Sequence, residues 1–393
     1  MKILILSFYY PPDIGPGPVR ACAIVDALQQ SNNSLGRVEI EILTTFPNRY
    51  ASFRERAERL EIHENVTIRR IKTLPHRNGF FDQCLTFLFY FLTVLTISSF
   101  KKPDVVFVTS SRLMSCFLGA VIARVRSAEL YLDVRDIFSE AISPVLKKKR
   151  LLVILPFLKM IEKFCFCSAT GINVVSEGFV DHVKEIAPNI TPTVYTNGID
   201  REFCEFNFQK DRSVGYRKIL YVGNVGDGQA LHEILPDVAQ VLGDNVFFTV
   251  IGDGSRKKEL TERIKTLGVK NIEFLQPVSR NQLFAFYREA DFLFCHLNNF
   301  QVFNSVLPSK IFEYAATGKP ILAGVSGYAS NFLERNVQGV EIFAPLDVSG
   351  MLSALKNLES VPKHTDRAAF CDEFSREKIS IEIAKKILDL KRS

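Results

Sequence analysis

Short runs of β-forming apolar residues alternate with helical patterns along the chain, which is typical of parallel βα units. In the first half, the predicted strands are residues 2–8, 38–44, 66–71, 104–109, 129–134 and 171–175. The pattern then restarts, with predicted strands at 218–223, 246–251, 271–275, 291–295, 320–324 and 340–343. Because an open twisted sheet seldom holds roughly twelve strands, two doubly wound parallel sheets in series fit this α/β pattern better than one.

The polar stretch between Asn197 and Arg217 lacks either periodicity and is the predicted seam between two domains. We assign residues 1–200 to a first Rossmann-like domain and residues 201–374 to a second. The segment at about 375–393 spaces its apolar residues like an amphipathic helix and is expected to pack back on the first domain. A chain of 393 residues, 47% of them hydrophobic, can bury two cores of this size.

Composition excludes several classes of protein. A net charge of +6 is too small for a dedicated nucleic-acid-binding protein, so no nucleic-acid partner is expected. The eight cysteines form no CxxC pair and indicate the reduced thiols of a cytosolic protein rather than a zinc site. The apolar start, MKILILSFYYPPD, has no small-residue cleavage site and is predicted to be a buried strand rather than a secretory signal.

Glycines gather after the predicted strands, where open parallel sheets bind ligands. After the first strand, Gly15 and Gly17 stand in PPDIGPGPVRA, but Arg20 replaces the third glycine of a dinucleotide fingerprint. In the second half, two clusters open predicted helices, and they comprise Gly223, Gly226, Gly228, Gly252 and Gly254. Such glycines let backbone N–H groups approach an anion, although a tight structural turn is the alternative. No GK[ST] follows, so neither cluster is a Walker A loop.

The stretch LPSKIFEYAATGKPILA, from Leu307 to Ala323, indicates a helix and then a short buried strand. Pro308 suits the first helical turn, and Ser309 can cap it or donate a hydrogen bond. Lys310 adds an ammonium to the free helix N–H groups, a combination that suits a phosphate. Glu313 lies one turn on and can accept two hydroxyl hydrogen bonds from a ribose. The alternative is an exposed ion pair worth about 0.3–0.5 kcal/mol; we favour the ligand.

These stretches resemble a known family. In chain order, FYYPPDIGPGPVRA, TNGID, YVGNVGDGQAL, VIGDGSRKKEL, ADFLFCHL and LPSKIFEYAATGKPILA are similar to family-four retaining glycosyltransferases of the GT-B fold. The resemblance is greatest to the branch that builds bacterial surface polysaccharides, including N-acetylfucosamine transferases of the O-antigen type. It spans nearly the whole chain and is stronger in the second half. It implies two Rossmann-like domains that face each other across a cleft.

The resemblance also implies roles for single residues. Glu313 matches the second glutamate of the family's E-x7-E motif, which holds the ribose, whereas Ser305 stands where the first glutamate is expected. Lys310 would contact the diphosphate. Asn224 and Gln229 occupy positions where many relatives carry an Arg and a Lys, so the positive charge at the diphosphate rests more heavily on Lys310 and on backbone amides.

Pro277 and Val278 match the segment whose backbone reads the base. The implied nucleotide-sugar site comprises Gly15, Gly17, Gly223, Asn224, Gly226, Gln229, Gly252, Asp253, Gly254, Pro277, Val278, Ser309, Lys310 and Glu313. In YLDVRDIFSE, Asp133, Arg135 and Asp136 match a segment that would face the reacting sugar and join Lys310 as catalytic residues. A structural pairing of Arg135 with Asp136 is an equally good interpretation.

The expected reaction needs no metal and no cofactor. The chain lacks the DxD motif that other glycosyltransferases use to hold a metal, and Lys310 with helix N-termini can neutralise the leaving diphosphate. Retention of configuration is implied by the resemblance alone. The donor is expected to be linked to uridine and to carry a sugar that includes, among the candidates, an N-acetylated deoxy sugar.

Two apolar stretches bear on membrane contact. Gln83 to Phe100 carries no charge over its length, which meets the threshold for a spanning helix, although a buried or surface-dipping helix fits the βα rhythm better. Lys147, Lys148, Lys149 and Arg150 precede a strongly apolar stretch, a composition attracted to anionic lipid; a solvated loop is the alternative. We expect a cytoplasmic protein, peripheral on the inner face of the cell membrane, that uses a polyprenyl-diphosphate-linked saccharide as acceptor.

Two other functions remain open. One is a nucleotide-sugar 2-epimerase of the same fold, which would need neither an acceptor nor a membrane. The other is a non-catalytic subunit that binds a nucleotide sugar, suggested by Ser305 and by the missing cations of the glycine loop.

Overall fold

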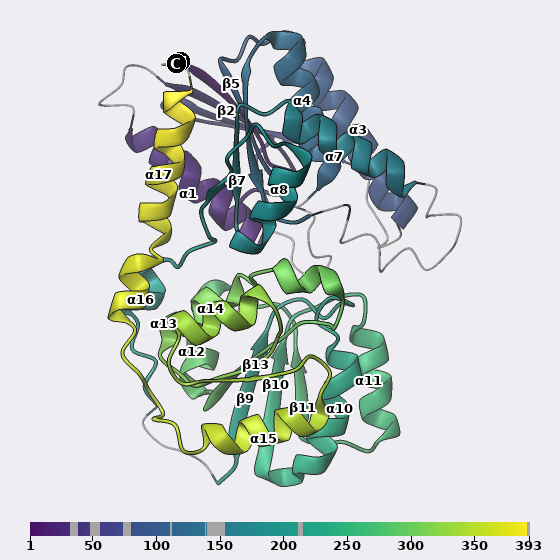
Figure 1. Ribbon diagram of the computed structural model, residues 1–393, viewed down its shortest axis with the longest axis vertical. Helices are drawn as coiled ribbons and strands as arrows, with labels where there is room; N and C mark the ends of the chain where they lie inside the picture. The colour runs from purple at the N-terminus through teal and green to yellow at the C-terminus, as the bar shows by residue number, and fades with distance from the viewer. Residues whose placement is uncertain are drawn as a thin grey trace. The chain divides into compact units, whose positions relative to one another are not determined.

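The computed structural model describes residues 1–31, 38–47, 56–73, 80–110, 112–137, 139, 154–210 and 215–390. The chain divides into two compact units, Met1–Asn197 with Arg376–Ser393 and Gly198–Ser375 (Figure 1). The sequence places the same three segments at 1–200, 201–374 and about 375–393. Both units are Rossmann-like α/β structures, and the predicted fold class is confirmed.

The first unit is built on an eight-stranded sheet in the order β3-β4-β2-β1-β5-β6-β7-β8. Its strands are β1 (Lys2–Leu6), β2 (Glu39–Thr45), β3 (Leu60–His63), β4 (Val66–Ile71), β5 (Val105–Ser110), β6 (Glu129–Val134), β7 (Gly171–Val174) and β8 (Thr193–Val194). All neighbours are parallel except β3, which runs antiparallel to β4. The sequence predicts six of these strands; it misses β3, which is mostly exposed, and β8, which is too short to show a period.

Helices cover both faces of this sheet, and they are α1 (Pro16–Gln30), α3 (Phe80–Ser98), α4 (Leu113–Arg126), α7 (Leu155–Cys167), α8 (Val180–Ile186) and α17 (Arg376–Asp389). Phe107 of β5 lies in one core with α1 and α17. The next residue, Val108, points to the opposite face and lies against Gly119 of α4. Phe117 of α4 stacks on Phe91 of α3 and packs edge-on against Phe164 of α7, so these three helices form one layer.

The second unit holds a six-stranded sheet in the order β11-β10-β9-β12-β13-β14, in which all neighbours are parallel. Its strands are β9 (Arg217–Val222), β10 (Val246–Ile251), β11 (Ile272–Leu275), β12 (Phe292–His296), β13 (Ile321–Gly324) and β14 (Val340–Phe343). All six are predicted from the sequence. This is the order of a doubly wound Rossmann sheet, and the winding reverses between β9 and β12.

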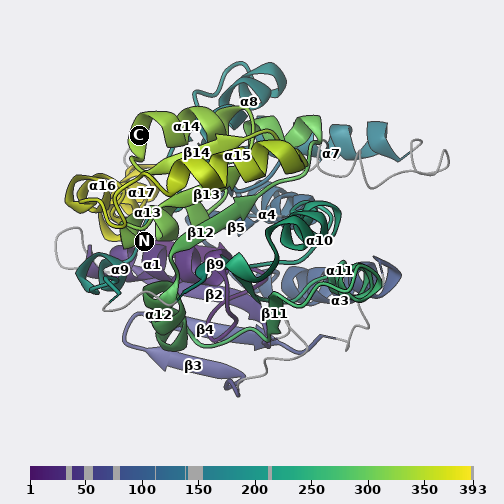
Figure 2. The same cartoon turned by 90° about the horizontal axis from the view of Figure 1, so that it is seen from below.

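The helices of the second unit are α9 (Arg201–Glu205), α10 (Leu231–Leu242), α11 (Lys257–Thr266), α12 (Arg280–Glu289), α13 (Lys310–Thr317), α14 (Tyr328–Asn336), α15 (Val348–Leu358) and α16 (Ala368–Glu373). These helices lie on both sides of the sheet, which can be followed in the view from below (Figure 2). The chain then returns to the first unit, where Ile383 and Ile387 of α17 are buried against Ile24 and Leu28 of α1.

Candidate active site

The candidate site of the second unit lies at the carboxyl ends of β9 and β12. Gly223 follows β9 directly, and α13 begins at Lys310 shortly after β12. These are the two strands between which the winding reverses, and the crevice formed there is where doubly wound sheets bind ligands. The fold therefore brings together the glycine loop and the lysine that the sequence predicts.

Lys310 is held in an unusual environment for a cation. Its Nζ lies 3.8 Å from the centroid of the Tyr221 ring, a cation–π contact. The Nζ atom is buried and has no hydrogen-bond partner among the residues that the structure describes. A Cβ atom placed on Gly223 would lie 2.9 Å from the Lys310 Nζ atom, so the ammonium lies close to the Gly223 backbone. Burial lowers the pKa of Lys310 to about 8.

The structure contradicts an exposed ion pair of Lys310 with Glu313, because the Lys310 ammonium is buried. The Glu313 carboxylate instead accepts a hydrogen bond from the buried Tyr287 hydroxyl at 3.1 Å. A buried ammonium without an acceptor is costly, because it has lost water and gained no hydrogen bond in return. An anion placed beside the Gly223 backbone would supply that bond.

The glycine loop after β9 is held by its own side chains. Asn224 donates from Nδ2 to the Gln229 side chain at 2.8 Å, and the Tyr221 hydroxyl donates to the Asn224 carbonyl at 2.6 Å. The ring that carries the cation–π contact is thus tied to the loop. Their mutual hydrogen bond gives Asn224 and Gln229 a role in shaping the loop, and contact of either residue with a nucleotide stays a prediction.

Residues at the end of β12 also hold this loop, and sequence reasoning missed them. His296 donates from Nδ1 to the Gln229 carbonyl at 2.7 Å and accepts from the Leu346 N–H at 3.1 Å, which requires the neutral ring. Burial lowers its pKa to about 4, consistent with that form. The Asn298 N–H donates to the Gly228 carbonyl at 2.8 Å. The sequence does contain a signal for these two residues: they are polar and stand at the carboxyl end of a buried strand, which is the edge of the sheet where ligands bind.

The second glycine cluster packs against the first. A Cβ atom on Gly252 would lie 1.8 Å from the Gly223 carbonyl oxygen, and one on Gly254 would lie 2.3 Å from that of Val225. The Asp253 carbonyl accepts from the Val225 N–H at 2.9 Å. These glycines are therefore required for backbone-to-backbone packing; contact of Gly252, Asp253 or Gly254 with a nucleotide stays a prediction.

The remaining predicted residues of this unit lie around the same edge. Ser309 is the residue before α13 and makes no side-chain cap. Pro277 and Val278 follow β11 and are partly buried, and Val278 packs on the core. Ser305 donates to the Val302 carbonyl at 2.9 Å. Nothing in these contacts identifies a base-binding segment, which stays a prediction.

In the first unit, Asp133 at the end of β6 is fully buried rather than turned toward a ligand. Arg20 donates two hydrogen bonds to its carboxylate, from Nε and from Nη2, both at 2.9 Å. The Thr109 hydroxyl donates to the same carboxylate at 2.7 Å. Asn173 donates as well. Burial alone would raise the pKa of Asp133, but the Arg20 charge and these hydrogen bonds outweigh it and hold the pKa below its usual value.

This network corrects the expectation that Asp133 faces a reacting sugar. Arg20 extends it, donating to the backbone carbonyls of Tyr195 and Thr196, so that α1, β6 and the end of the first unit are tied together. Both carboxylate oxygens of Asp133 have donors, and the residue is a structural anchor. It also explains why Arg20 stands where a dinucleotide fingerprint would have glycine.

Arg135 lies next to the glycine loop that follows β1, which contains Gly15 and Gly17. A Cβ atom on Gly17 would lie 2.5 Å from Nη1 of Arg135, so the guanidinium rests on the glycine backbone. Gly15 has φ of 136°, a conformation that favours glycine. Arg135 and Asp136 are both partly buried. The structure brings Gly17 and Arg135 together; a catalytic role for Arg135 or Asp136 stays a prediction.

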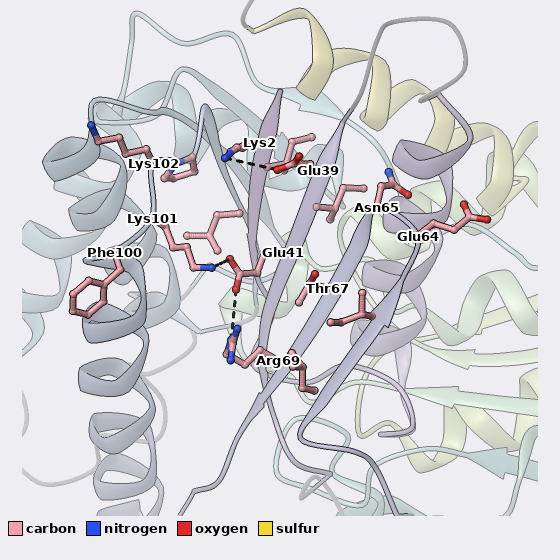
Figure 3. A pocket seen from close by; sticks show the side chains of 16 residues that line it. Lys2, Glu39, Glu41, Glu64, Asn65, Thr67, Arg69, Phe100, Lys101 and Lys102 are labelled. Carbon is pink, nitrogen blue, oxygen red and sulfur yellow. Dashed lines mark ion pairs between the residues drawn. The ribbon is translucent and has the colours of Figure 1, made fainter.

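A pocket of about 470 Å³ lies at the other edge of the first sheet, near the amino ends of β1, β2 and β4 (Figure 3). Several of its charges pair within it: Lys2 pairs with Glu39 at 3.7 Å, and Glu41 lies between Arg69 at 3.5 Å and Lys101 at 3.1 Å. It lies far along the strands from Gly15 and Gly17, which follow the carboxyl end of β1. We assign it no ligand.

Three predictions concern metal and membrane. No cluster of three or more His, Cys, Asp or Glu side chains suited to a metal occurs among the described residues. Lys147, Lys148, Lys149 and Arg150 lie outside the described residues. Gln83 to Phe100 forms most of α3, and within the described part of the chain no helix has the length and apolarity needed to cross a bilayer.

The fold and this site define a class of protein. Residues 203–370, which include the glycine loop, Lys310 and Glu313, match the family "Glycosyl transferases group 1". The matched residues lie within the second unit and make up less than half of the chain, and the match agrees with the glycosyltransferase enzyme that the sequence predicts.

Comparison with known proteins adds one relative in sequence and two neighbours in fold. The chain is 25% identical over 150 residues to WcaI of Escherichia coli K12, whose name assigns it to colanic acid biosynthesis as a glycosyl transferase. That match covers 37% of this chain and only 36% of WcaI. Sucrose-phosphate synthase from Thermosynechococcus elongatus has a TM-score of 0.73 at 12% identity, over 100% of this chain and 99% of its own. Anabaena HepE, in complex with UDP, has a TM-score of 0.66 at 16% identity, over 98% and 99%.

Proposed function

We propose that this protein is a retaining glycosyltransferase that moves a sugar from a nucleotide-sugar donor to a lipid-linked saccharide in surface-polysaccharide synthesis. It acts in the cytoplasm, peripherally at the inner face of the cell membrane. The observation that carries the proposal is the buried Lys310 ammonium, which lies against the Gly223 backbone without an acceptor. A diphosphate at this point would bind both the ammonium and the N–H groups of the glycine loop.

The donor and acceptor are inferred from different sources. A uridine-linked donor is supported by the fold shared with HepE, which binds UDP, and by Glu313 beside the diphosphate site as a ribose acceptor. A saccharide acceptor is supported by the name of WcaI, which refers to colanic acid. The polyprenyl-diphosphate carrier and an N-acetylated deoxy sugar rest on the sequence resemblance.

The chemistry proposed is a front-face displacement. The bond between the sugar C1 and the diphosphate oxygen breaks, and the acceptor oxygen bonds to C1 from the same face. The acceptor's proton passes to the departing diphosphate oxygen, so no covalent enzyme intermediate is needed. Lys310 and the backbone N–H groups stabilise the negative charge that develops on the leaving group. We therefore propose transfer without a metal, and undiminished turnover in EDTA is the expected result.

The test is donor turnover with a panel of nucleotide sugars, each with and without a lipid-linked saccharide. A transferase releases nucleoside diphosphate that depends on the acceptor and makes a longer saccharide. A 2-epimerase isomerises the donor without an acceptor, and a binding subunit shows affinity for a donor without turnover. Neither binding nor turnover with any donor would contradict the proposal.

The pH dependence of UDP binding provides a second test. Because the pKa of Lys310 is about 8, its charge is present below that pH and is lost as the pH rises. The phosphates of UDP do not change charge above pH 7, since a terminal phosphate titrates near pH 6. We expect UDP affinity, measured by calorimetry, to fall by up to about tenfold per pH unit above pH 8.

Lys310→Met should remove this pH dependence. The matched control is Lys319→Met, because Lys319 also has a pKa lowered to about 8 by burial but donates to the carbonyls of Arg288 and Ala290. This control should keep the pH dependence. An affinity that is flat from pH 7 to 9 in the wild type would argue against a diphosphate at Lys310.

A further inference from the structure

The helix α3 has two apolar faces, and one of them is exposed. Its inner face includes Phe87, which stacks on Phe8 at 5.7 Å, and Tyr90, which donates to the Leu43 carbonyl at 2.9 Å. The outer face carries a stripe with helical spacing whose members are 47–55% exposed: Leu85, Leu88, Phe89 and Leu92. From Leu85 to Ser98 the helix carries no charged residue. Burial of the inner face alone therefore does not account for its composition.

A second stripe occurs in the same layer of helices. Ile154, Phe157 and Met160, at the start of α7, are 44–59% exposed, whereas Ile161 and Cys165 on the inner side are buried. Helices α3 and α7 flank α4 through the contacts of Phe117, so both stripes belong to the layer that covers one face of the first sheet. We call these seven exposed side chains the apolar face. So many exposed large apolar side chains in one layer indicate a contact surface.

The exposed charges on α4 and α7 have one sign, whereas α8, which packs on α7, exposes Asp181, Lys184 and Glu185. On α4 and α7 the exposed charged residues are cationic, and they include Arg124, Lys159 and Lys163. The acidic residue of these two helices, Glu162, is fully buried, where it accepts from the Ser139 hydroxyl at 2.5 Å. An anionic partner would complement the cations of α4 and α7.

We propose that the apolar face is a docking surface for an anionic lipid bilayer, into whose interface α3 and α7 insert their exposed side chains. Apolar side chains flanked by lysine and arginine are the composition of interfacial helices, which lie in the headgroup region without crossing the membrane. Self-association through this face fits less well, because a two-fold dimer places each patch against its own copy and would bring the like charges together. The inference deepens the proposed function, on which it rests, by naming the surface through which the protein would bind the membrane that holds its lipid-linked acceptor.

Flotation with vesicles tests the proposal on the full chain. Binding is measured to vesicles of neutral phosphatidylcholine and to vesicles that also contain phosphatidylglycerol. The wild type should float with the anionic vesicles, and added salt should weaken this binding. The double variant Leu88→Gln/Leu92→Gln should bind at least about tenfold more weakly, because two large apolar side chains no longer leave water. Val241→Gln is the matched control, since Val241 is 65% exposed on α10 of the other unit, and it should bind like the wild type.

The charge is tested separately. Lys159→Gln/Lys163→Gln should reduce binding to anionic vesicles by at least about tenfold, since each cation near an anionic surface contributes. UDP affinity and thermal unfolding, measured on every variant, should be unchanged, which separates this proposal from the proposed function. A wild-type protein that floats with the vesicles but does not bind UDP would count against the proposed function alone. Equal flotation of wild type and Leu88→Gln/Leu92→Gln would overturn the proposal, as would a wild-type dimer that this variant dissociates without any vesicle binding.

Discussion

Lys310→Met is expected to lower the turnover of the nucleotide-sugar donor by about 10²-fold or more, because it removes the main side-chain donor to the leaving diphosphate. Methionine keeps the length of the side chain and its packing against Tyr221. The measurement is kcat and KM under saturating acceptor. Since the charge acts most strongly on the diphosphate as it departs, we expect the loss mainly in kcat. Near-normal turnover would remove Lys310 from the mechanism.

The same variant should unfold at a higher temperature than the wild type. The pKa of Lys310 is lowered from 10.5 to about 8 in the folded chain, so folding disfavours the charged form. This penalty is fully present below pH 8 and disappears as the pH rises toward 10.5. Allowing for the lost cation–π contact, Lys310→Met should raise the free energy of unfolding by about 1 kcal/mol at pH 7. A variant that is inactive because it is less stable than the wild type would contradict this account.

Asp133→Ala is expected to lower the free energy of unfolding by about 3–5 kcal/mol, because it leaves the Arg20 guanidinium buried without its carboxylate. Both side chains are almost completely buried, 1% and 0% exposed. Urea denaturation followed by a signal from the first unit measures the change. The double variant Arg20→Met/Asp133→Leu should recover much of the loss, because no charge is then left unpaired.

This series distinguishes an anchor from a catalytic residue. If Asp133 acts on substrate, its replacement should abolish turnover while the stability stays close to that of the wild type. If it is the anchor that the structure shows, stability falls first and the double variant recovers both stability and UDP binding. An unchanged free energy of unfolding in Asp133→Ala would be incompatible with the buried network.

Local patterns explain why much of the fold was predictable. The strands of both sheets, except β3 and β8, are short apolar runs bounded by turn residues, and their alternation with helices gives the βα rhythm that predicts parallel sheets. The helix that Lys310 and Glu313 open was predictable, and it follows β12, one of the two strands between which the winding of the second sheet reverses. Contact of Lys310 and Glu313 with a nucleotide stays a prediction. The exposure of the outer face of α3 was not predictable, since an uncharged helix shows no polar side.

Long-range pairing explains the rest. Arg20 and Asp133 are 113 residues apart, and no spacing in the sequence indicates that they meet. The resemblance to a family suggested a catalytic Asp133, whereas burial shows a structural one. His296 and Gln229, 67 residues apart, are a similar case. Gly252 was interpreted as a ligand contact, although the Gly223 carbonyl already occupies the space that a side chain would fill.

The most direct test of the central claim is the crystal structure of the protein in complex with UDP. The account predicts a diphosphate oxygen within hydrogen-bond distance of Lys310 Nζ and of a backbone N–H in the loop from Gly223 to Gly226, with the ribose hydroxyls on Glu313. A nucleotide bound elsewhere, with the Lys310 ammonium still without an acceptor, would contradict it.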